Sequence, residues 1–345
     1  MCIRDRYIEL EIMHHDKFMQ KAIELARQGE GLTYPNPPVG AVLVENNSIV
    51  ATGWHEKSNL DHAEVVCIKN YKGQNISNCT LYITLEPCSS YGDTPPCTEC
   101  IIKSGIKKIF IGAIDPNPKH NGKAIELLRN RGINVTSGVC KDEALELIKP
   151  FRKRILEGLP YITLKMAITL DGRIADLDGK SKWITSDKSR EYVHQLRNKV
   201  DAIMVGSNTV IMDDPLLLPT LPKAKSPWRI IIGNNIPKNS KILNDSFADR
   251  TIIKSGDLKK ILYDLSKDKG ILHILCEGGS VLATSLIEEK LVDKLILFIA
   301  PKLLGVDGLP CFNLKEINMD DIFSLSNVAY KQIGNDIMVT SYLGK

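Results

Sequence analysis

The chain has 345 residues, of which 43% are hydrophobic and 25% charged, a composition typical of folded globular proteins rather than disordered or fibrous ones. Lysine and arginine number 45 against 41 aspartates and glutamates, and the resulting net charge of +4 is too small to indicate a nucleic-acid partner. No apolar run approaches the ~20 residues of a membrane span, and nine cysteines, an odd number, do not form a secreted disulfide framework. We therefore expect a cytoplasmic protein with two domains that binds neither nucleic acid nor a membrane.

The first part of the chain alternates between helical and strand patterns. The predicted elements are a helix over 16–27, a hairpin of strands 39–44 and 48–53, a helix over 62–70, a strand over 80–85, a helix over 97–104, a strand over 107–112, a helix over 122–131 and a strand over 133–136. This alternation predicts a layered α/β domain over 13–150. Residues 1–12 form an extension outside the pattern, and Met13 is the expected start.

A charged helix is predicted over 143–156, and Gly158-Leu159-Pro160 ends it, so we place the domain boundary there. The second domain, 158–345, repeats the α/β pattern. Its predicted elements are strands 161–168, 201–205, 228–232, 251–253, 271–276, 293–299 and 337–342 and helices 187–197, 257–267 and 280–288. The proline-containing stretch 213–227 is predicted to be a loop.

One set of residues in the first domain has the spacing of a metal site. His62 and Glu64 begin a helix, Cys88 follows a strand directly after Pro87, and Cys97 begins another helix. One imidazole and two thiolates leave a tetrahedral zinc ion one position for water, whose pKa the metal lowers to about 7. Glu64, beside that water, would carry protons to and from the substrate. This H-x-E…P-C pattern is typical of zinc deaminases.

The second thiolate is ambiguous from spacing alone, because Cys97-x-x-Cys100 also has ligand spacing. We prefer Cys88 and Cys97, since Pro87-Cys88 ends a strand where the deaminase pattern has its first thiolate. The other cysteines are interpreted as ordinary buried or surface residues; they are Cys2, Cys67, Cys79, Cys140, Cys276 and Cys311.

The motifs, taken together, resemble the bifunctional riboflavin-biosynthesis deaminase–reductase family. In the first domain they are Pro35-Asn36-Pro37-Pro38-Val39-Gly40, His62-Ala63-Glu64, Leu85-Glu86-Pro87-Cys88-Ser89, Thr94-Pro95-Pro96-Cys97 and Asp115-Pro116-Asn117-Pro118. In the second they are Lys165-Met166-Ala167-Ile168-Thr169-Leu170-Asp171-Gly172-Arg173, Trp183-Ile184-Thr185-Ser186, Asp213-Asp214-Pro215, Glu277-Gly278-Gly279 and residues 299–305. The resemblance extends from Met13 to the C-terminus.

The resemblance implies a cytidine-deaminase-like three-layer domain followed by a dihydrofolate-reductase-like α/β domain. It implies deamination of a diaminopyrimidinone ribosylamine phosphate, followed by NADPH reduction of the ribosyl group to ribityl. It also supports His62, Cys88 and Cys97 as the zinc ligands, Glu64 as the catalytic residue, and Asn36 and His55 as substrate contacts. The expected partners are a small-molecule pyrimidine substrate and further copies of the chain in a homo-oligomer.

The second domain has fewer motifs that indicate a function from the residues alone. Gly278-Gly279-Ser280 lies between a strand and a helix, where free N–H groups can bind phosphate, but the G-x-G-x-x-G fingerprint is absent. The resemblance implies NADPH contacts at Ala167, Trp183, Thr209, Asp213, Gly279 and Ser280. It implies substrate contacts at Lys165, Ser181, Arg197, Leu217 and Glu277. We further expect Lys165 and Asp171 to shape the reacting centre.

The sequence departs from the family pattern where the substrate phosphate is expected. Ser90 and Asp93 stand where the family has a histidine and a cation, and Thr220 stands near the position of an expected arginine. An aspartate near a phosphate reverses the electrostatic sign of the contact. One alternative is therefore a related deaminase–reductase that acts on a different pyrimidine, such as an unphosphorylated one, and another is that one domain is inactive. A deaminase acting on single-stranded RNA and a zinc-stabilised scaffold without catalysis fit less well.

Overall fold

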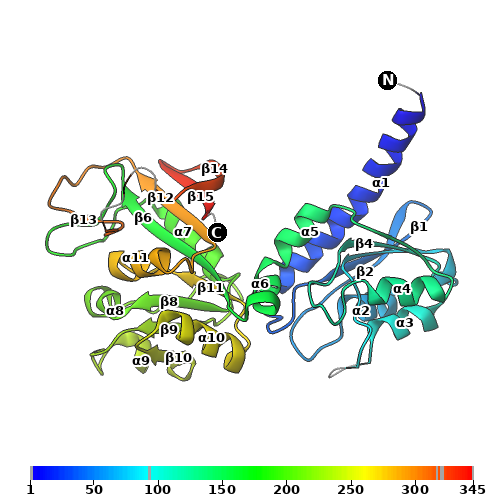
Figure 1. Ribbon diagram of the computed structural model, residues 1–345, viewed down its shortest axis with the longest axis horizontal. Helices are drawn as coiled ribbons and strands as arrows, with labels where there is room; N and C mark the ends of the chain where they lie inside the picture. The colour runs from blue at the N-terminus through cyan, green and yellow to red at the C-terminus, as the bar shows by residue number, and fades with distance from the viewer. Residues whose placement is uncertain (1–2, 92–94, 316–317, 319–321, 344–345) are drawn as a thin grey trace. The chain divides into compact units, whose positions relative to one another are not determined.

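The structure is a computed structural model that describes residues 3–91, 95–315, 318 and 322–343, with side chains from residue 15 onward. Cys2 and Asp93 lie outside the described residues. The chain divides into two compact units, Met1–Glu157 and Gly158–Lys345, which are described separately (Figure 1).

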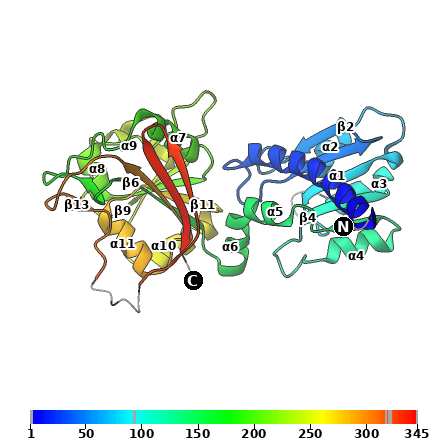
Figure 2. The ribbon, with the colours of Figure 1, turned by 90° about the horizontal axis from the view of Figure 1, so that it is seen from above.

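The first unit is a three-layer α/β domain. Its strands are β1 (Gly40–Glu45), β2 (Ser48–Trp54), β3 (Thr80–Leu85), β4 (Lys108–Ala113) and β5 (Asn134–Ser137), and its helices are α1 (Ile3–Ala26), α2 (Ala63–Asn70), α3 (Cys97–Ser104), α4 (Lys123–Asn130), α5 (Lys141–Leu147) and α6 (Lys149–Glu157). The sheet order is β2-β1-β3-β4-β5, with β1 antiparallel to both neighbours and β3, β4 and β5 parallel. Helices α1 and α5 cover one face and α2, α3 and α4 cover the other (Figure 2).

Two glycines let helices lie directly on this sheet. A Cβ at Gly40 would come within 2.0 Å of the carbonyl oxygen of Ala22 in α1, and one at Gly53 within 2.4 Å of the carbonyl oxygen of Ala63 in α2. Any side chain at position 53 would therefore push α2 away from β2. Because α2 begins directly after His62, this close packing sets the distance of His62 and Glu64 from the sheet.

The second unit has an eight-stranded sheet. Its strands are β6 (Tyr161–Thr169), β8 (Ala202–Gly206), β9 (Trp228–Ile232), β10 (Thr251–Lys254), β11 (His273–Cys276), β12 (Lys294–Ala300), β14 (Leu325–Ile333) and β15 (Asp336–Leu343); β7 (Arg173–Ala175) and β13 (Leu309–Pro310) form a separate pair. Its helices are α7 (Asp187–Arg197), α8 (Ser207–Asp213), α9 (Lys241–Asn244), α10 (Leu258–Lys269) and α11 (Ser280–Glu288).

The order of this sheet is β10-β9-β8-β11-β6-β12-β15-β14, parallel except at β15 and β14. Apolar residues of α10 and α11 pack against one face, and residues of α7 and α8 pack against the other. The parallel strands therefore all have their carboxyl ends on the same side of the sheet. In open α/β folds, ligands bind beyond these carboxyl ends.

Most predicted elements are present within one or two residues of their expected ends. The short helices α8 and α9 were not predicted, and the other differences lie at helix ends and in short or edge strands. The helix expected over 143–156 is two helices, α5 and α6, since Pro150 lacks an N–H and cannot continue a helix from the preceding turn. The first helix begins at Ile3 rather than near residue 16. Strand β14 was not predicted, although Gly334-Asn335 before β15 is a two-residue hairpin signal.

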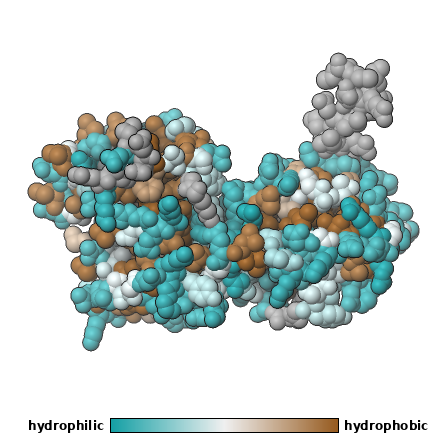
Figure 3. Space-filling view, in the orientation of Figure 1, coloured by the Kyte–Doolittle hydropathy of each residue, from teal (hydrophilic) through white to brown (hydrophobic). Residues whose placement is uncertain are grey.

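The surface seen in Figure 3 is mostly hydrophilic, with hydrophobic groups between polar ones. Among the described residues, no helix combines the length and the apolar character that a membrane crossing requires. The longest helix, α1, has 24 residues but carries charges along its length.

Candidate active sites

The first site forms where three chain segments meet beyond the carboxyl end of β3. His62, Cys88 and Cys97 place a ring nitrogen and two sulfurs within 4.8 Å of one another. The Nδ1 atom of His62 lies 3.2 Å from Sγ of Cys97 and 3.7 Å from Sγ of Cys88. One imidazole and two thiols around one point are the donor set of a three-ligand zinc site, so these residues fit a zinc ion.

Helix N-termini make this position favourable for thiolates. His62 is the N-cap residue of α2, and Cys97 is the first residue of α3. The backbone N–H of Cys97 also donates to Sγ of Cys88 at 3.2 Å. Hydrogen bonding from Cys97 and from His62 holds the pKa of the Cys88 thiol well below its usual range. A low thiol pKa is what metal binding requires, because the ligand is the thiolate.

Glu64 lies in the first turn of α2, two residues after His62, with only 3% of its surface exposed. Burial raises the pKa of its carboxyl to about 7, against the opposing positive charge of His62. Cys100 is half-buried on α3 and does not join the group of His62, Cys88 and Cys97 within the described part of the chain.

Two of the residues expected to bind substrate lie beside this group. The ring of His55 contacts that of His62 edge-on, with centroids 5.1 Å apart. Nδ1 of His55 lies 3.1 Å from the carbonyl oxygen of Asp61, so Nδ1 carries the proton and donates, and Nε2 accepts from the Asn36 amide at 3.5 Å. Burial lowers the pKa of His55, which favours this neutral form.

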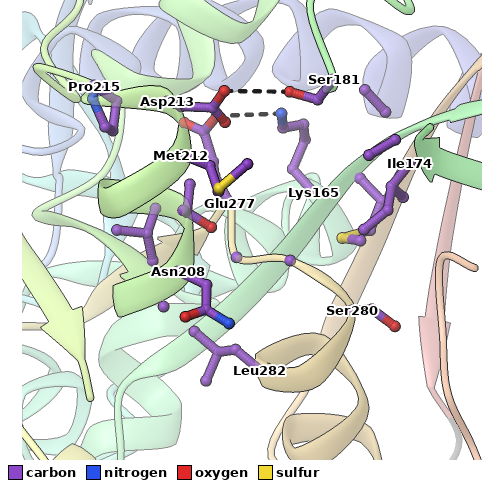
Figure 4. A pocket seen from close by; sticks show the side chains of 18 of the residues that line it. Lys165, Ile174, Ser181, Asn208, Met212, Asp213, Pro215, Glu277, Ser280 and Leu282 are labelled. Carbon is purple, nitrogen blue, oxygen red and sulfur yellow. Dashed lines mark hydrogen bonds and ion pairs between the residues drawn. The ribbon is translucent and has the colours of Figure 1, made fainter. Parts of the chain in front are cut away.

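The second site is a cleft of about 1530 Å³ at the carboxyl edge of the parallel strands. All eleven residues expected to bind NADPH or substrate in this unit line it: Lys165, Ala167, Ser181, Trp183, Arg197, Thr209, Asp213, Leu217, Glu277, Gly279 and Ser280. Figure 4 shows part of the lining, with Ser181 donating to Asp213 at 3.3 Å and Lys165 paired with Glu277.

A buried group of three charges lies in this cleft. Glu277, at the end of β11, accepts from Nε and Nη2 of Arg197 at 2.6 and 3.0 Å, and its Oε2 lies 3.2 Å from Nζ of Lys165. Burial alone would raise the pKa of Glu277, but the positive charges of Arg197 and Lys165 outweigh it and hold that pKa at about 2. The group therefore carries a net charge of about +1, which suits an anionic ligand.

One end of the cleft offers phosphate-binding features. Gly279 is the N-cap residue of α11, and Ser280 begins that helix. Among the described residues, the buried Oγ of Ser280 has no hydrogen-bond partner. An unsatisfied hydroxyl beside free helix N–H groups fits a phosphate of NADPH.

The segment that carries Trp183 is held from three directions. Lys302 donates to the Trp183 carbonyl at 2.8 Å, and the Arg190 guanidinium lies 4.4 Å from the Trp183 ring centroid. Asp336 accepts hydrogen bonds from the backbone N–H and the hydroxyl of Ser186 at 2.8 and 2.7 Å. These contacts place the indole at the cleft, where its ring is mostly exposed.

Asp171, expected at the reacting centre, does not line the cleft in the described structure. Its carboxylate accepts from the hydroxyl of Thr169 and from the backbone N–H groups of Leu304 and Gly305, and these bonds lower its pKa to about 2. Asp171 thus fixes a loop near the cleft. Thr220 does line the cleft, and its N–H donates to Nδ1 of His194 at 3.3 Å.

Sequence reasoning missed several residues that the structure places at the two sites. Glu86 is buried next to the cysteine loop and accepts from the N–H groups of Asp115, Gly122 and Ala124 at 2.9 to 3.1 Å. His194 and Asp336 were likewise not singled out. A polar residue that binds distant backbone groups leaves no pattern in the nearby sequence. The one available signal was proximity to expected site residues: Glu86 adjoins Pro87-Cys88, and His194 precedes Arg197 by about one helical turn.

Each half of the chain matches a known protein family. The family model of the cytidine and deoxycytidylate deaminase zinc-binding region matches residues 13–113, and that of the RibD C-terminal domain matches residues 160–339. The riboflavin biosynthesis protein RibD of Aquifex aeolicus is 41% identical over 93% of this chain and 96% of its own length. RibD of Escherichia coli is 36% identical over 86% of this chain and 90% of its own.

Two solved structures are similar over nearly the whole chain. Acinetobacter baumannii RibD superimposes with a TM-score of 0.90 and 34% identity, covering 97% of this chain and 100% of that one. A diaminohydroxyphosphoribosylaminopyrimidine deaminase/5-amino-6-(5-phosphoribosylamino)uracil reductase from Thermotoga maritima gives 0.87 and 35%, with the same coverage.

Proposed function

The chain belongs to the RibD family of bifunctional riboflavin-biosynthesis deaminase–reductases, and from this premise we propose how its residues divide the two reactions. The deaminase domain is residues 13–150 and the reductase domain residues 158–345. The first converts a diaminopyrimidinone ribosylamine phosphate to the aminouracil. The second uses NADPH to reduce the ribosyl group of that product to ribityl.

His62, Cys88 and Cys97 hold the zinc ion in this proposal, and their mutual distances support it. Zinc supplies, when bound, a water molecule activated for attack at neutral pH. Glu64 accepts the proton of that water on its carboxylate and passes it to a ring nitrogen of the pyrimidine. Once the water oxygen has bonded to the ring carbon, the Glu64 carboxylate takes the remaining proton from that hydroxyl and gives it to the amino group, which departs as ammonia while the carbonyl forms. Burial beside His62 keeps bulk water from competing for these protons.

Asn36 and His55 orient the pyrimidine above Glu64. Their contact with each other and the edge-on packing of His55 against His62 support this placement. Neutral His55 has one acceptor lone pair, on Nε2, and this atom can exchange its bond from the Asn36 amide for one from an amino or ring N–H group of the substrate. The phosphate contacts at Ser90 and Asp93 remain the point at which this chain differs from its family pattern.

In the reductase, Lys165, Ser181, Arg197, Leu217 and Glu277 contact the substrate. The net positive charge of the buried group suits a phosphorylated sugar, since Arg197 and Lys165 outnumber Glu277. Ala167, Trp183, Thr209, Asp213, Gly279 and Ser280 contact NADPH. The cleft of about 1530 Å³ exceeds the roughly 300–1,000 Å³ of a typical ligand pocket, which supports simultaneous binding of cofactor and substrate. The protein positions the nicotinamide against the sugar carbon, and the cofactor carries the hydride.

We also propose that the enzyme is cytoplasmic and a homo-oligomer, without nucleic-acid or membrane partners. The eight cysteines that the structure describes are free, as expected in a reducing compartment. Strand β14 lies at the edge of its sheet with all residues but Ile333 exposed, which leaves a surface for association. Light scattering on the purified chain tests this: the mass of one chain would contradict self-association.

Mass spectrometry of the purified enzyme with the diaminopyrimidinone phosphate tests the function. Without NADPH we expect one product, in which oxygen has replaced an amino group; with NADPH we expect the same product carrying two more hydrogens. Conversion of only an unphosphorylated analogue would favour a different pyrimidine substrate, the alternative suggested by Asp93 and Thr220. Conversion in only one step would show one inactive domain.

A further inference from the structure

Arg229 is the largest side chain that the second unit buries completely, and it is charged. It lies on β9, beneath the loop that joins α8 to β9. Its Nη1 and Nη2 form a two-pronged pair with the Asp245 carboxylate at 2.5 and 2.8 Å. Burying a guanidinium costs folding free energy, which an ion pair and hydrogen bonds offset. A guanidinium buried to this degree therefore suggests a positioning role.

The two terminal nitrogens of Arg229 also bind main-chain carbonyls, while its buried Nε has no hydrogen-bond partner among the described residues. Nη2 donates to the carbonyls of Ile242 and Phe247 at 2.9 and 2.7 Å, and Nη1 donates to the carbonyl of Leu216 at 3.1 Å. Leu216 belongs to the cleft wall. Arg229 thus connects that wall to a fixed point formed by α9 and the turn after it.

The loop that Arg229 holds has an unfavourable backbone. Asp214 and Leu217 both have positive φ, at 44° and 55°, a conformation that residues with a Cβ adopt only under constraint. Leu218, the next residue, accepts a hydrogen bond from Nη1 of Arg197 at 3.4 Å. The guanidiniums of Arg229 and Arg197 therefore bind the carbonyls of Leu216 and Leu218. Leu217, with its positive φ, lies between these two residues.

We propose that Arg229 is a positioning residue for substrate binding in the reductase. By fixing the Leu216 carbonyl, it keeps Leu217 in its left-handed conformation and Leu218 within reach of Arg197. Arg197 then stays oriented by contacts on two sides, from Glu277 and from the loop. Arg229 does not itself line the cleft. This inference rests on the proposed function, which assigns Leu217 and Arg197 to the substrate.

The test is R229K, which keeps the charge but cannot satisfy Asp245 and three carbonyls together. We expect the KM for the aminouracil substrate to rise about ten-fold, the effect of one lost hydrogen bond, with kcat and the NADPH dissociation constant changed less than about two-fold. D245N keeps the bond to Leu216 but loosens the guanidinium, so its KM should rise by a smaller factor. R250K, at an arginine 4.9 Å from the Trp228 ring, is the matched control and should leave KM unchanged.

Deaminase kinetics on the same preparations report whether the rest of the chain is intact and should not change. An unchanged substrate KM in R229K, or a parallel fall of kcat and NADPH affinity, would overturn the proposal in favour of a purely structural role. If R229K does not fold, D245N decides alone, and a wild-type KM in D245N overturns it. A wild-type enzyme that fails to oxidise NADPH with this substrate would instead contradict the proposed function.

Discussion

Replacing Glu277 by glutamine tests the electrostatics of the reductase cleft. In the native chain Glu277 is ionised between Arg197 and Lys165, which are only 17% and 14% exposed. Its pKa of about 2, against 4.5 for a free glutamate, corresponds to roughly 3 kcal/mol of stability at neutral pH. E277Q removes this charge and leaves two buried cations facing each other. We expect its free energy of unfolding to fall by about 3 kcal/mol at pH 7.

The pH dependence of this loss has a definite sign. Because the folded-state pKa of Glu277 is depressed, its contribution is complete above about pH 4.5 and is lost as pH falls toward 2. The stability difference between wild type and E277Q should therefore shrink to about half at pH 3. Urea unfolding followed by tryptophan fluorescence at several pH values measures it, and NADPH oxidation should show a raised substrate KM.

The exposed Glu191 on α7 provides a matched control, and E191Q should change stability by less than about 0.5 kcal/mol. A stability loss in E277Q below about 1 kcal/mol at pH 7, or one that stays constant down to pH 3, would refute the reasoning.

Three further predictions concern the deaminase. Cys88→Ala and Cys97→Ala should lose zinc in elemental analysis while Cys100→Ala retains it; the reverse pattern would overturn the ligand assignment. Glu64→Gln should keep zinc but deaminate roughly 10²–10⁴-fold more slowly, and near-wild-type turnover would show that another group carries the proton. Asp93→Lys combined with Ser90→His should raise kcat/KM for the phosphorylated pyrimidine by up to about ten-fold, mainly through KM; a loss of activity would show that other cations already bind the phosphate.

The sequence predicted the regular elements well because their signals are local. The ends of α7, α11 and β9 match the expected residues, since each has a clear apolar period bounded by a cap or by a proline. The two strands of the β7–β13 pair are too short for any periodicity to appear. Pro150 is a local signal that the predicted helix over 143–156 is interrupted, and the prediction of a single helix did not use it.

The two sites were predictable to different degrees. His62, Glu64, Cys88 and Cys97 have a spacing that indicates zinc chemistry without any family knowledge, and the structure brings the three ligand candidates together. Lys165, Arg197 and Glu277 are far apart in the sequence, and only the resemblance grouped them. Arg229 had no signal at all: a lone arginine in a strand pattern does not reveal that it binds a loop 13 residues earlier.

We expect the two sites of this chain to act separately and in order, deamination before reduction. NADPH oxidation by Glu64→Gln measures this most directly, with either the diaminopyrimidinone phosphate or the already deaminated aminouracil as substrate. We predict wild-type rates with the deaminated compound and little oxidation with the diamino compound, because only the first site is disabled. Wild-type oxidation with the diamino compound, or loss of oxidation with both, would contradict the account.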